Sequence, residues 1–348
     1  MASSLPSSSS SAPKADDEAA SHKEIYDQLR EVVSTYPTTP RLSGIGRPYV
    51  CHPDGWYAFT PGVLNAMVIK RHLEARDTDV LLATFPKSGT TWLKALLFAA
   101  LHRTADDRLA AHSPHQLVPF LEARVFTNGR IPDLSSLPAP RLLMTHIPSV
   151  SLPESVAASG CKVVYRVRTP RTASCRSGTS GTEHALGYWR WHLERPAQVL
   201  FLTYEELAAD TLGQLRRLAG FVGRPFTAEE REAGVDRGIV EACAMESLAG
   251  LEVNRSGKTD MAESSVPNNV FFRRDVVGDC KNHLTPEMAR RLDEITESKF
   301  RGSGLVLPRA TTHLGRVWLV SPSGLARRAK TSQAEQGLGK EKQGQKRR

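Results

Sequence analysis

Residues 81–101 read LLATFPKSGTTWLKALLFAAL and carry the strongest structural signal in the chain. The stretch begins with apolar residues at strand length, turns through the anion loop (Phe85-Pro86-Lys87-Ser88-Gly89-Thr90-Thr91) and continues as an apolar segment of helix length. A strand, a glycine-containing loop and a helix N-terminus in this order bind anions, because backbone N–H groups and the helix dipole both favour phosphate. Lys87 adds a positive charge, and the loop hydroxyls add donors. The alternative is an ordinary strand-to-helix turn that contains these residue types.

Short apolar runs elsewhere predict the strands of a parallel sheet. Runs of strand length cover 80–85, 141–145, 161–167 and 199–203. Helical spacing of apolar residues covers 22–36, 63–75, 204–222, 228–243 and 286–300. Short strands that alternate with helices indicate an α/β fold, a single domain in which helices flank a central parallel sheet.

Length and composition are those of a soluble globular protein. Of the 348 residues, 40% are hydrophobic and 24% are charged. No apolar run has membrane-spanning length, and the N-terminus lacks the apolar core of a secretory signal, so we expect a cytoplasmic protein without a membrane partner. The five cysteines are scattered, without a CxxC pair, which predicts free thiols rather than disulfides or a zinc site.

Two segments of biased composition flank the predicted domain, residues 22–305. Residues 1–21 are rich in serine and predict a disordered lead-in, with a plastid transit peptide as the alternative. Residues 306–348 contain ten Lys or Arg and two Asp or Glu, a net charge of +8, whereas the rest of the chain carries +1. This basic tail predicts a disordered, solvated segment, and nucleic acid or an anionic membrane would be contacted only through it.

The anion loop differs from the common nucleotide-binding loop. Walker A reads GxxxxGK[ST], whereas Lys87 precedes Gly89 by two residues. The order PKSGTTW instead resembles the 5′-phosphosulfate loop of cytosolic sulfotransferases. Six further segments follow the order of the plant type of this family over about residues 25–305: SPHQLVPFLE, RLLMTHIP, CKVVYRVRTPR, LGYWRWHLERPAQVLFLTYEEL, EVNRSGK and FFRRDVVGDCKNHLTPEMARRLDEITESKFRGSGL.

The resemblance implies transfer of a sulfuryl group from 3′-phosphoadenosine 5′-phosphosulfate (PAPS) to a hydroxyl group of a small acceptor. Flavonoids, hydroxyjasmonates and steroids are acceptors of this kind. It assigns catalysis to His146, which would take the acceptor's proton, and to Lys87, which would stabilise charge on the bridging oxygen. His115 is a second candidate, expected to line the acceptor pocket. Lys and Arg carry the charge, so no metal is expected. The acceptor and the oligomeric state are not readable from the sequence.

The resemblance also implies the contacts to PAPS. Ser88, Gly89, Thr90 and Thr91 would hold the 5′-phosphate together with Lys87. Trp92 would stack on adenine, and Tyr204, Ser256 and Phe271 would lie near it. Arginines would bind the 3′-phosphate through their planar forks: Arg168, Arg273 and Arg274. The alternatives are a core position for Trp92 and surface salt bridges for the arginines.

Four departures from the family pattern concern the 3′-phosphate and the pocket wall. Arg176 occupies the position of a phosphate-binding serine, and the connection from Arg168 to Leu186 is far shorter than in the family. Asp275 replaces a glycine, and Cys280 replaces a tryptophan. The shortened connection predicts an opened pocket, lower stability, or both.

These departures leave a second hypothesis beside the sulfotransferase, a catalytically impaired relative that keeps the fold and binds nucleotide weakly. A P-loop kinase is a third hypothesis. The position of Lys87 and the lack of a matching Mg²⁺ arrangement argue against it.

Overall fold

The computed structural model describes residues 15–39, 49–57, 60–86, 88–103, 105–169, 180–262, 264–272 and 284–307. These residues all belong to one unit of the chain, Met1–His313. Some predicted features lie outside the described residues: Lys87, Arg176 in the shortened connection, Arg273, Arg274, Asp275 and Cys280, and the basic tail from residue 308 onward. No helix within the described ranges is long and apolar enough to cross a membrane.

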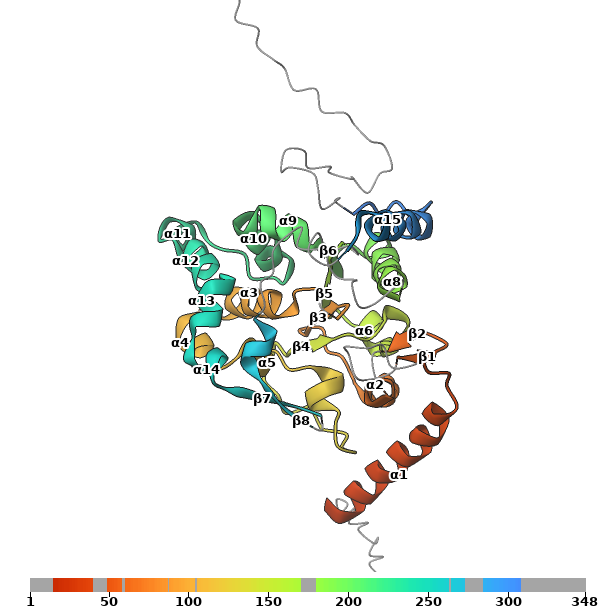
Figure 1. Ribbon diagram of the computed structural model, residues 1–348. Coiled ribbons are helices and arrows are strands. Elements are labelled where there is room, and N and C mark those ends of the chain that lie inside the picture. The colour runs from red at the N-terminus through yellow and green to blue at the C-terminus, as the bar shows by residue number, and fades with distance from the viewer. Residues whose placement is uncertain are drawn as a thin grey trace, which may run out of the picture. The chain divides into compact units, whose positions relative to one another are not determined.

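Four parallel strands form the central sheet, in the order β4-β3-β5-β6 (Figure 1). Their bounds are Leu142–Thr145 (β4), Val80–Thr84 (β3), Lys162–Val167 (β5) and Val199–Thr203 (β6). In the register, Leu82 of β3 pairs with Met144 on one side and Val164 on the other. The predicted α/β fold with a central parallel sheet is therefore confirmed. Its strands are continuous apolar runs, as expected for strands buried on both faces.

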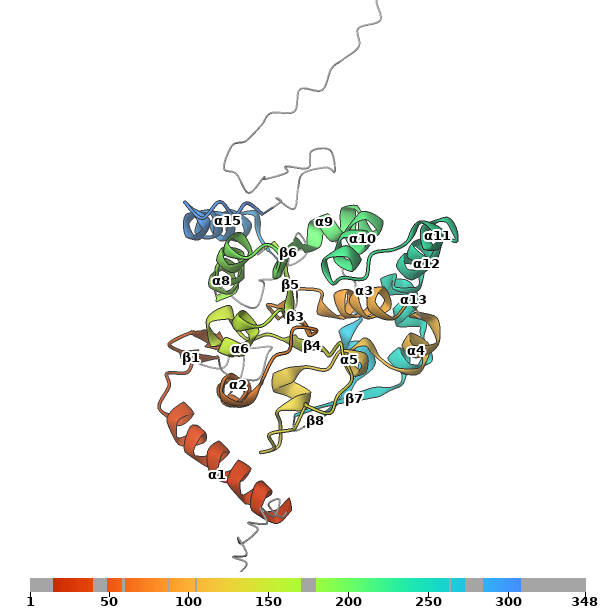
Figure 2. The same cartoon turned by 180° about the vertical axis from the view of Figure 1, so that it is seen from behind.

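Alternate residues of each strand pack into two apolar layers, one on each face of the sheet. Leu81 and Val163 belong to the first layer, and Leu82 and Val164 belong to the second. Helices α2 (Thr60–His72), α6 (Glu154–Ala158) and α8 (Ser180–Glu194) cover the first face. The second face is covered by α3 (Thr90–His102), α10 (Thr211–Phe221) and α12 (Val235–Ala242), and both views show this division (Figure 1, Figure 2).

The remaining elements complete the described part of the chain. The helices are α1 (Ala15–Ser34), α4 (Ala105–Ala111), α5 (Pro114–Leu117), α9 (Tyr204–Ala209), α11 (Ala228–Glu232), α13 (Met245–Gly250), α14 (Glu252–Arg255) and α15 (Pro286–Phe300). A π-helix, η1 (Leu121–Val125), and two 3₁₀ turns, η2 (Ser149–Ser151) and η3 (Asn268–Phe271), lie between them. Two antiparallel pairs are formed by β1 (Val50–His52) with β2 (Gly55–Tyr57) and by β7 (Lys258–Met261) with β8 (Ser264–Pro267).

Three helical predictions need correction. The first helix begins at Ala15 rather than at residue 22. Asp17 and Glu18 lie in the first turn of this helix, where the helix dipole favours acidic side chains. The helix predicted over 204–222 is divided at Asp210, whose side chain caps α10 by accepting from the Gly213 N–H (2.8 Å). The helix predicted over 228–243 is divided at Gly234, which has a φ of +78°.

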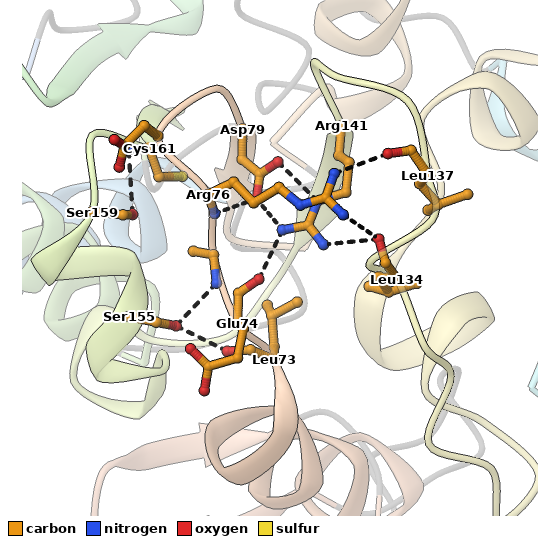
Figure 3. A network of polar contacts seen from close by, with 12 residues as sticks. Leu73, Glu74, Arg76, Asp79, Leu134, Leu137, Arg141, Ser155, Ser159 and Cys161 are labelled. Atoms are coloured by element: carbon orange, nitrogen blue, oxygen red, sulfur yellow. Dashed lines mark hydrogen bonds and ion pairs between the residues drawn. The ribbon is translucent and has the colours of Figure 1, made fainter. Parts of the chain in front are cut away.

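A buried ion pair joins the amino ends of β3 and β4 (Figure 3). Asp79 precedes β3 and Arg141 precedes β4, and both carboxylate oxygens of Asp79 accept from the guanidinium, one of them at 2.8 Å. The two side chains are 5% and 3% exposed. The Arg141 guanidinium also donates to the Glu74 carbonyl (2.7 Å). This network joins the two strands at their amino ends, whereas the anion loop lies at the carboxyl end of β3.

Candidate active site

The anion loop connects the carboxyl end of β3 to the first turn of α3. Gly89 is the residue before α3 and has a left-handed backbone (φ 85°, ψ 33°). A Cβ atom at this position would lie 1.8 Å from Nη2 of Arg166 and 3.2 Å from Cδ2 of Tyr204. Glycine is therefore required here both by backbone conformation and by space. Ser88, beside it, is buried, and Lys87 lies outside the described residues.

Two arginines from β5 and its carboxyl end lie beside this loop. The guanidinium of Arg166 is fully buried and donates to the backbone carbonyl of Ser88. Its Cζ lies 5.1 Å from the ring centroid of Tyr204, and the Cζ of Arg168 lies 4.1 Å from the same centroid. Two positive charges are thus held beside the anion loop. Arg168 was expected here, whereas Arg166 was missed, although a charged residue inside the apolar run KVVYRV was a visible signal.

Tyr204 is the first residue of α9 and also contacts the loop helix. Its ring meets the indole of Trp92 edge to face, with centroids 5.8 Å apart. The Trp92 indole N–H is buried and has no hydrogen-bond partner among the residues that the structure describes. Thr203, the last residue of β6, caps α9 together with Glu206, which fixes where Tyr204 stands. Trp92 and Tyr204 therefore form one aromatic corner beside the arginines.

Ser256 and Phe271 come from the region after α13. Ser256 is exposed, and its hydroxyl donates to a carboxylate oxygen of Glu252 (2.7 Å) rather than to another predicted site residue. Phe271 lies closer to the loop elements, because its ring centroid is 4.0 Å from that of His115. Of these two predicted adenine neighbours, Phe271 has a described contact with the residues around the loop.

His146 follows β4, the strand next to β3. Its Nδ1 lies 2.6 Å from the carbonyl oxygen of Thr84, the last residue of β3. A ring nitrogen this close to a carbonyl carries the proton and donates it, so the basic lone pair is on Nε2. The backbone N–H of His146 donates to Glu122 (2.6 Å), and the Phe120 ring lies 4.9 Å away, centroid to centroid. These contacts fix both the position and the tautomer of the imidazole.

Glu122 anchors the backbone at His146 from the π-helix η1. Its second carboxylate oxygen accepts from the Thr145 hydroxyl (3.0 Å). Burial raises the pKa of Glu122, and the hydrogen bonds from His146 and Thr145 oppose this rise. Sequence reasoning did not identify Glu122, although an acidic residue in the apolar segment VPFLEARVF was a signal.

His184, on α8, also contacts the backbone of His146. Its Nε2 donates to the backbone carbonyl of His146 (3.0 Å), and its Nδ1 accepts from the Tyr165 hydroxyl (3.0 Å). Burial lowers the pKa of His184 from 6.5 to about 4, so the imidazole is neutral, as one donor and one acceptor require.

The carboxyl end of β5 is anchored to α9. Both the backbone N–H and the hydroxyl of Thr169 donate to Glu205, at 3.1 and 2.9 Å. Burial raises the pKa of Glu205, while the Thr169 hydrogen bonds and the charge of Arg168 lower it. These contacts hold the chain that carries Arg168 beside Tyr204. Residues 170–179 lie outside the description.

Among the described residues, no group of three or more His, Cys, Asp or Glu side chains is arranged to hold a metal ion. Cys51, Cys161 and Cys243 are not joined to one another by disulfides. Burial raises the pKa of Cys161 to about 12, so this thiol is unreactive at neutral pH.

Comparison with known proteins identifies the family of this constellation. The sulfotransferase domain matches residues 77–175 and 173–304. The chain belongs to the sulfotransferase family. It is 36% identical over 323 residues to cytosolic sulfotransferase 5 of Arabidopsis thaliana, covering 81% of this chain and 97% of that protein.

Solved structures show the same fold. An Arabidopsis thaliana protein assigned as a steroid sulphotransferase is 30% identical, with a TM-score of 0.63 over 86% of this chain and 100% of that one. The mouse sulfotransferase SULT7A1, crystallised with PAP, is 21% identical, with a TM-score of 0.54 over 74% of this chain and 96% of that one. The second likeness shows the fold alone.

The comparison also bears on the shortened connection. The 323 aligned positions cover 81% of this chain, and 81% of 348 residues is about 282, so about 40 positions of the relative have no counterpart here. The two matched segments of the domain meet at residues 173–175, between β5 and α8. The domain match is thus interrupted in the connection that was expected to be short.

Proposed function

We propose that this protein acts in the cytoplasm and transfers a sulfuryl group from PAPS to a hydroxyl group of a small-molecule acceptor. Membership of the sulfotransferase family supports the reaction, and the relative named cytosolic supports the compartment. The observation that carries the proposal is the pairing of His146 with the anion loop. Because Nδ1–H of His146 donates to Thr84, Nε2 is the nitrogen that accepts a proton, and Thr84 is also the residue from which the loop begins.

His146 is proposed as the general base. Its Nε2 takes the proton of the acceptor hydroxyl while the hydroxyl oxygen forms a bond to sulfur. The bond between sulfur and the bridging phosphate oxygen breaks, and its electron pair stays on that oxygen, which leaves as part of 3′,5′-adenosine bisphosphate (PAP). Lys87 is proposed to stabilise this developing charge, since a cation fixed at that point acts mainly in the transition state.

The described residues fit an adenosine bisphosphate. The left-handed Gly89 presents the N-terminus of α3, and its lack of a Cβ leaves room for the Arg166 guanidinium beside the loop. The proposed 5′-phosphate ligands are Lys87, Ser88, Gly89, Thr90 and Thr91, and those of the 3′-phosphate are Arg168, Arg273 and Arg274. Adenine is proposed to lie against Trp92, Tyr204, Ser256 and Phe271. The Trp92–Tyr204 corner beside Arg168 supports this arrangement.

The remaining assignments follow from the same proposal. The catalytic domain spans residues 22–305, extended at its N-terminus by the first turns of α1. Guanidinium and ammonium groups supply the positive charge, and no metal is required. Flavonoids, steroids and hydroxyjasmonates are the acceptor classes to be tested.

The first experiment is calorimetric titration of the full chain with PAP. We expect micromolar binding, about 8 kcal/mol. Transfer is then measured with radiolabelled PAPS against a panel of the three acceptor classes. His146→Ala is expected to reduce turnover by about a hundredfold to ten-thousandfold, the usual contribution of a general base, while PAP binding persists. Lys87→Ala is expected to lose turnover as well.

Two outcomes contradict the proposal at different points. A folded chain that does not bind PAP would refute the use of PAPS. A wild-type chain that binds PAP but modifies no acceptor of the panel would be a nucleotide-binding relative without the transfer activity.

A further inference from the structure

A buried line of three polar side chains leads from the interior to the anion loop. The ammonium of Lys94, on α3, lies 3.2 Å from Nδ1 of His115, on α5. On the other side of the ring, Nε2 of His115 lies 3.0 Å from the hydroxyl oxygen of Thr91, in the first turn of α3. Lys94 is fully buried, and His115 and Thr91 are 3% and 8% exposed. His115 is therefore part of the support of the loop, and the expected role of lining the acceptor pocket gains no support from these contacts.

The chemistry of the three groups decides which one donates in each hydrogen bond of the line. An ammonium group only donates, so Nδ1 of His115 must present its lone pair to Lys94. The neutral ring then carries its proton on Nε2, which donates to the oxygen of Thr91. The Thr91 hydroxyl cannot direct its own proton back along the same contact, so the proton is free to point to an acceptor elsewhere.

Two neighbouring groups stabilise the charged form of Lys94 against the cost of burying it. Its Nζ lies 3.7 Å from the centroid of the Phe120 ring, a position that stabilises a cation. Burial lowers the pKa of Lys94 well below its usual value, the carboxylate of Glu122 opposes this change, and Arg124 adds to it. The His115 lone pair and the Phe120 ring thus stabilise an ammonium that is otherwise costly to bury.

We propose that Lys94 and His115 are positioning residues that direct the Thr91 hydroxyl, so that it donates its proton to the 5′-phosphate of PAPS. This inference rests on the proposed function, because it takes the anion of the loop to be that phosphate. The hydrogen-bonded line from Lys94 through His115 to Thr91, called the relay below, is a property of the protein without ligand. The two can therefore be tested separately.

The first test reads the tautomer of His115 directly. Long-range proton–nitrogen correlation spectra of the ¹⁵N-histidine-labelled protein distinguish a ring protonated at Nε2 from one protonated at Nδ1. We expect the Nε2–H form in the wild type, and a loss of this preference in Lys94→Met, which keeps an unbranched, nearly as long side chain without the donor. A His115 ring protonated at Nδ1, or at both nitrogens, would reverse or break the relay and overturn the inference.

The second test uses substitutions that keep one half of the relay each. Gln places an amide donor near the position of Nε2, whereas Asn places its amide near Nδ1. We expect His115→Gln to bind PAP within about threefold of the wild type, and His115→Asn and His115→Phe to bind about ten- to a hundredfold more weakly, the cost of losing one hydrogen bond to a charged group. Equal affinities of the Gln and Asn variants would contradict the inference.

A double-mutant cycle separates positioning from general support of the fold. In the background of Thr91→Val, which has no hydroxyl to direct, His115→Asn should weaken PAP binding no further. A full, additive loss would show that His115 acts by another route. If the wild type itself fails to bind PAP, the proposed function fails, while the tautomer measurement still decides the relay.

Discussion

Replacing Gly89 by alanine adds one methyl group where the anion loop meets α3, and we expect this change to be unusually costly. The backbone of Gly89 is left-handed, a conformation that costs an alanine about 1 kcal/mol. The new Cβ would also lie 1.8 Å from Nη2 of Arg166. That group is not the end of a loose side chain, because it is buried and donates to the carbonyl of Ser88.

The guanidinium must therefore move and lose this hydrogen bond. A hydrogen bond made by a charged group contributes about 1.5–3 kcal/mol. Together with the backbone term, Gly89→Ala should lower the free energy of unfolding by about 2.5–4 kcal/mol. It should also weaken PAP binding, since the loop shifts with the arginine.

Urea denaturation provides the measurement, and Gly129→Ala is a matched control. Gly129 also has a positive φ, +71°, but a Cβ there meets nothing within 4 Å, so only the backbone cost of about 1 kcal/mol is expected. In the background of Arg166→Met, the excess cost of Gly89→Ala over the control should shrink, because the obstacle has been replaced by a flexible side chain. Equal costs at the two glycines would refute this account of the loop.

Two further predictions concern stability. The pKa of His184 is about 4 in the folded protein and about 6.5 when unfolded, so the stability that the neutral imidazole contributes is fully present above pH 6.5 and is lost as the pH falls towards 4. The free energy of unfolding should therefore drop by about 2 kcal/mol between pH 7.5 and 5, and this part of the drop should be absent in His184→Gln. The same dependence of unfolding free energy on pH in both proteins would contradict the prediction. Asp79→Ala leaves the buried guanidinium of Arg141 without its carboxylate and should lower the free energy of unfolding in urea by about 3–5 kcal/mol. Asp77→Ala is a control that loses a single exposed hydrogen bond to Gly160, and it should cost about 1 kcal/mol or less. Comparable losses would show that the ion pair does not stabilise the amino ends of β3 and β4.

The sheet could be predicted closely from the sequence. Each strand is an apolar run too short for a helix, and the loop after residue 84 has a composition that few other structures explain. Helix limits were harder to predict where the apolar spacing continues across a break. Asp210 ends α9 by capping α10, and Gly234 precedes α12 with a positive φ. Neither residue interrupts the helical spacing of the apolar residues around it.

The candidate site was predictable where residue type and motif coincide, as at His146, Arg168 and Gly89. It was not predictable where the role depends on packing between distant segments. Glu122 holds the backbone at His146 across 24 residues of sequence, and Arg166 reaches a carbonyl 78 residues away. The local sequence pattern does not predict such a contact, because the contact forms only when neighbouring strands align in the sheet.

The parallel sheet has a consequence for how the protein tolerates change. The anion loop, His146, Arg168 and Tyr204 follow β3, β4, β5 and β6 in turn, and neighbouring strands lie about 4.8 Å apart through their own hydrogen bonds. The spacing of these groups is thus set by the ladder of the backbone, and the length of the connections on either side does not enter it. The connection between β5 and α8, where the domain match is interrupted, can therefore differ in length without moving the residues at the ends of the strands. Laboratory redesign of the acceptor wall can use the same freedom, grafting connections of different length between strands whose register stays unchanged.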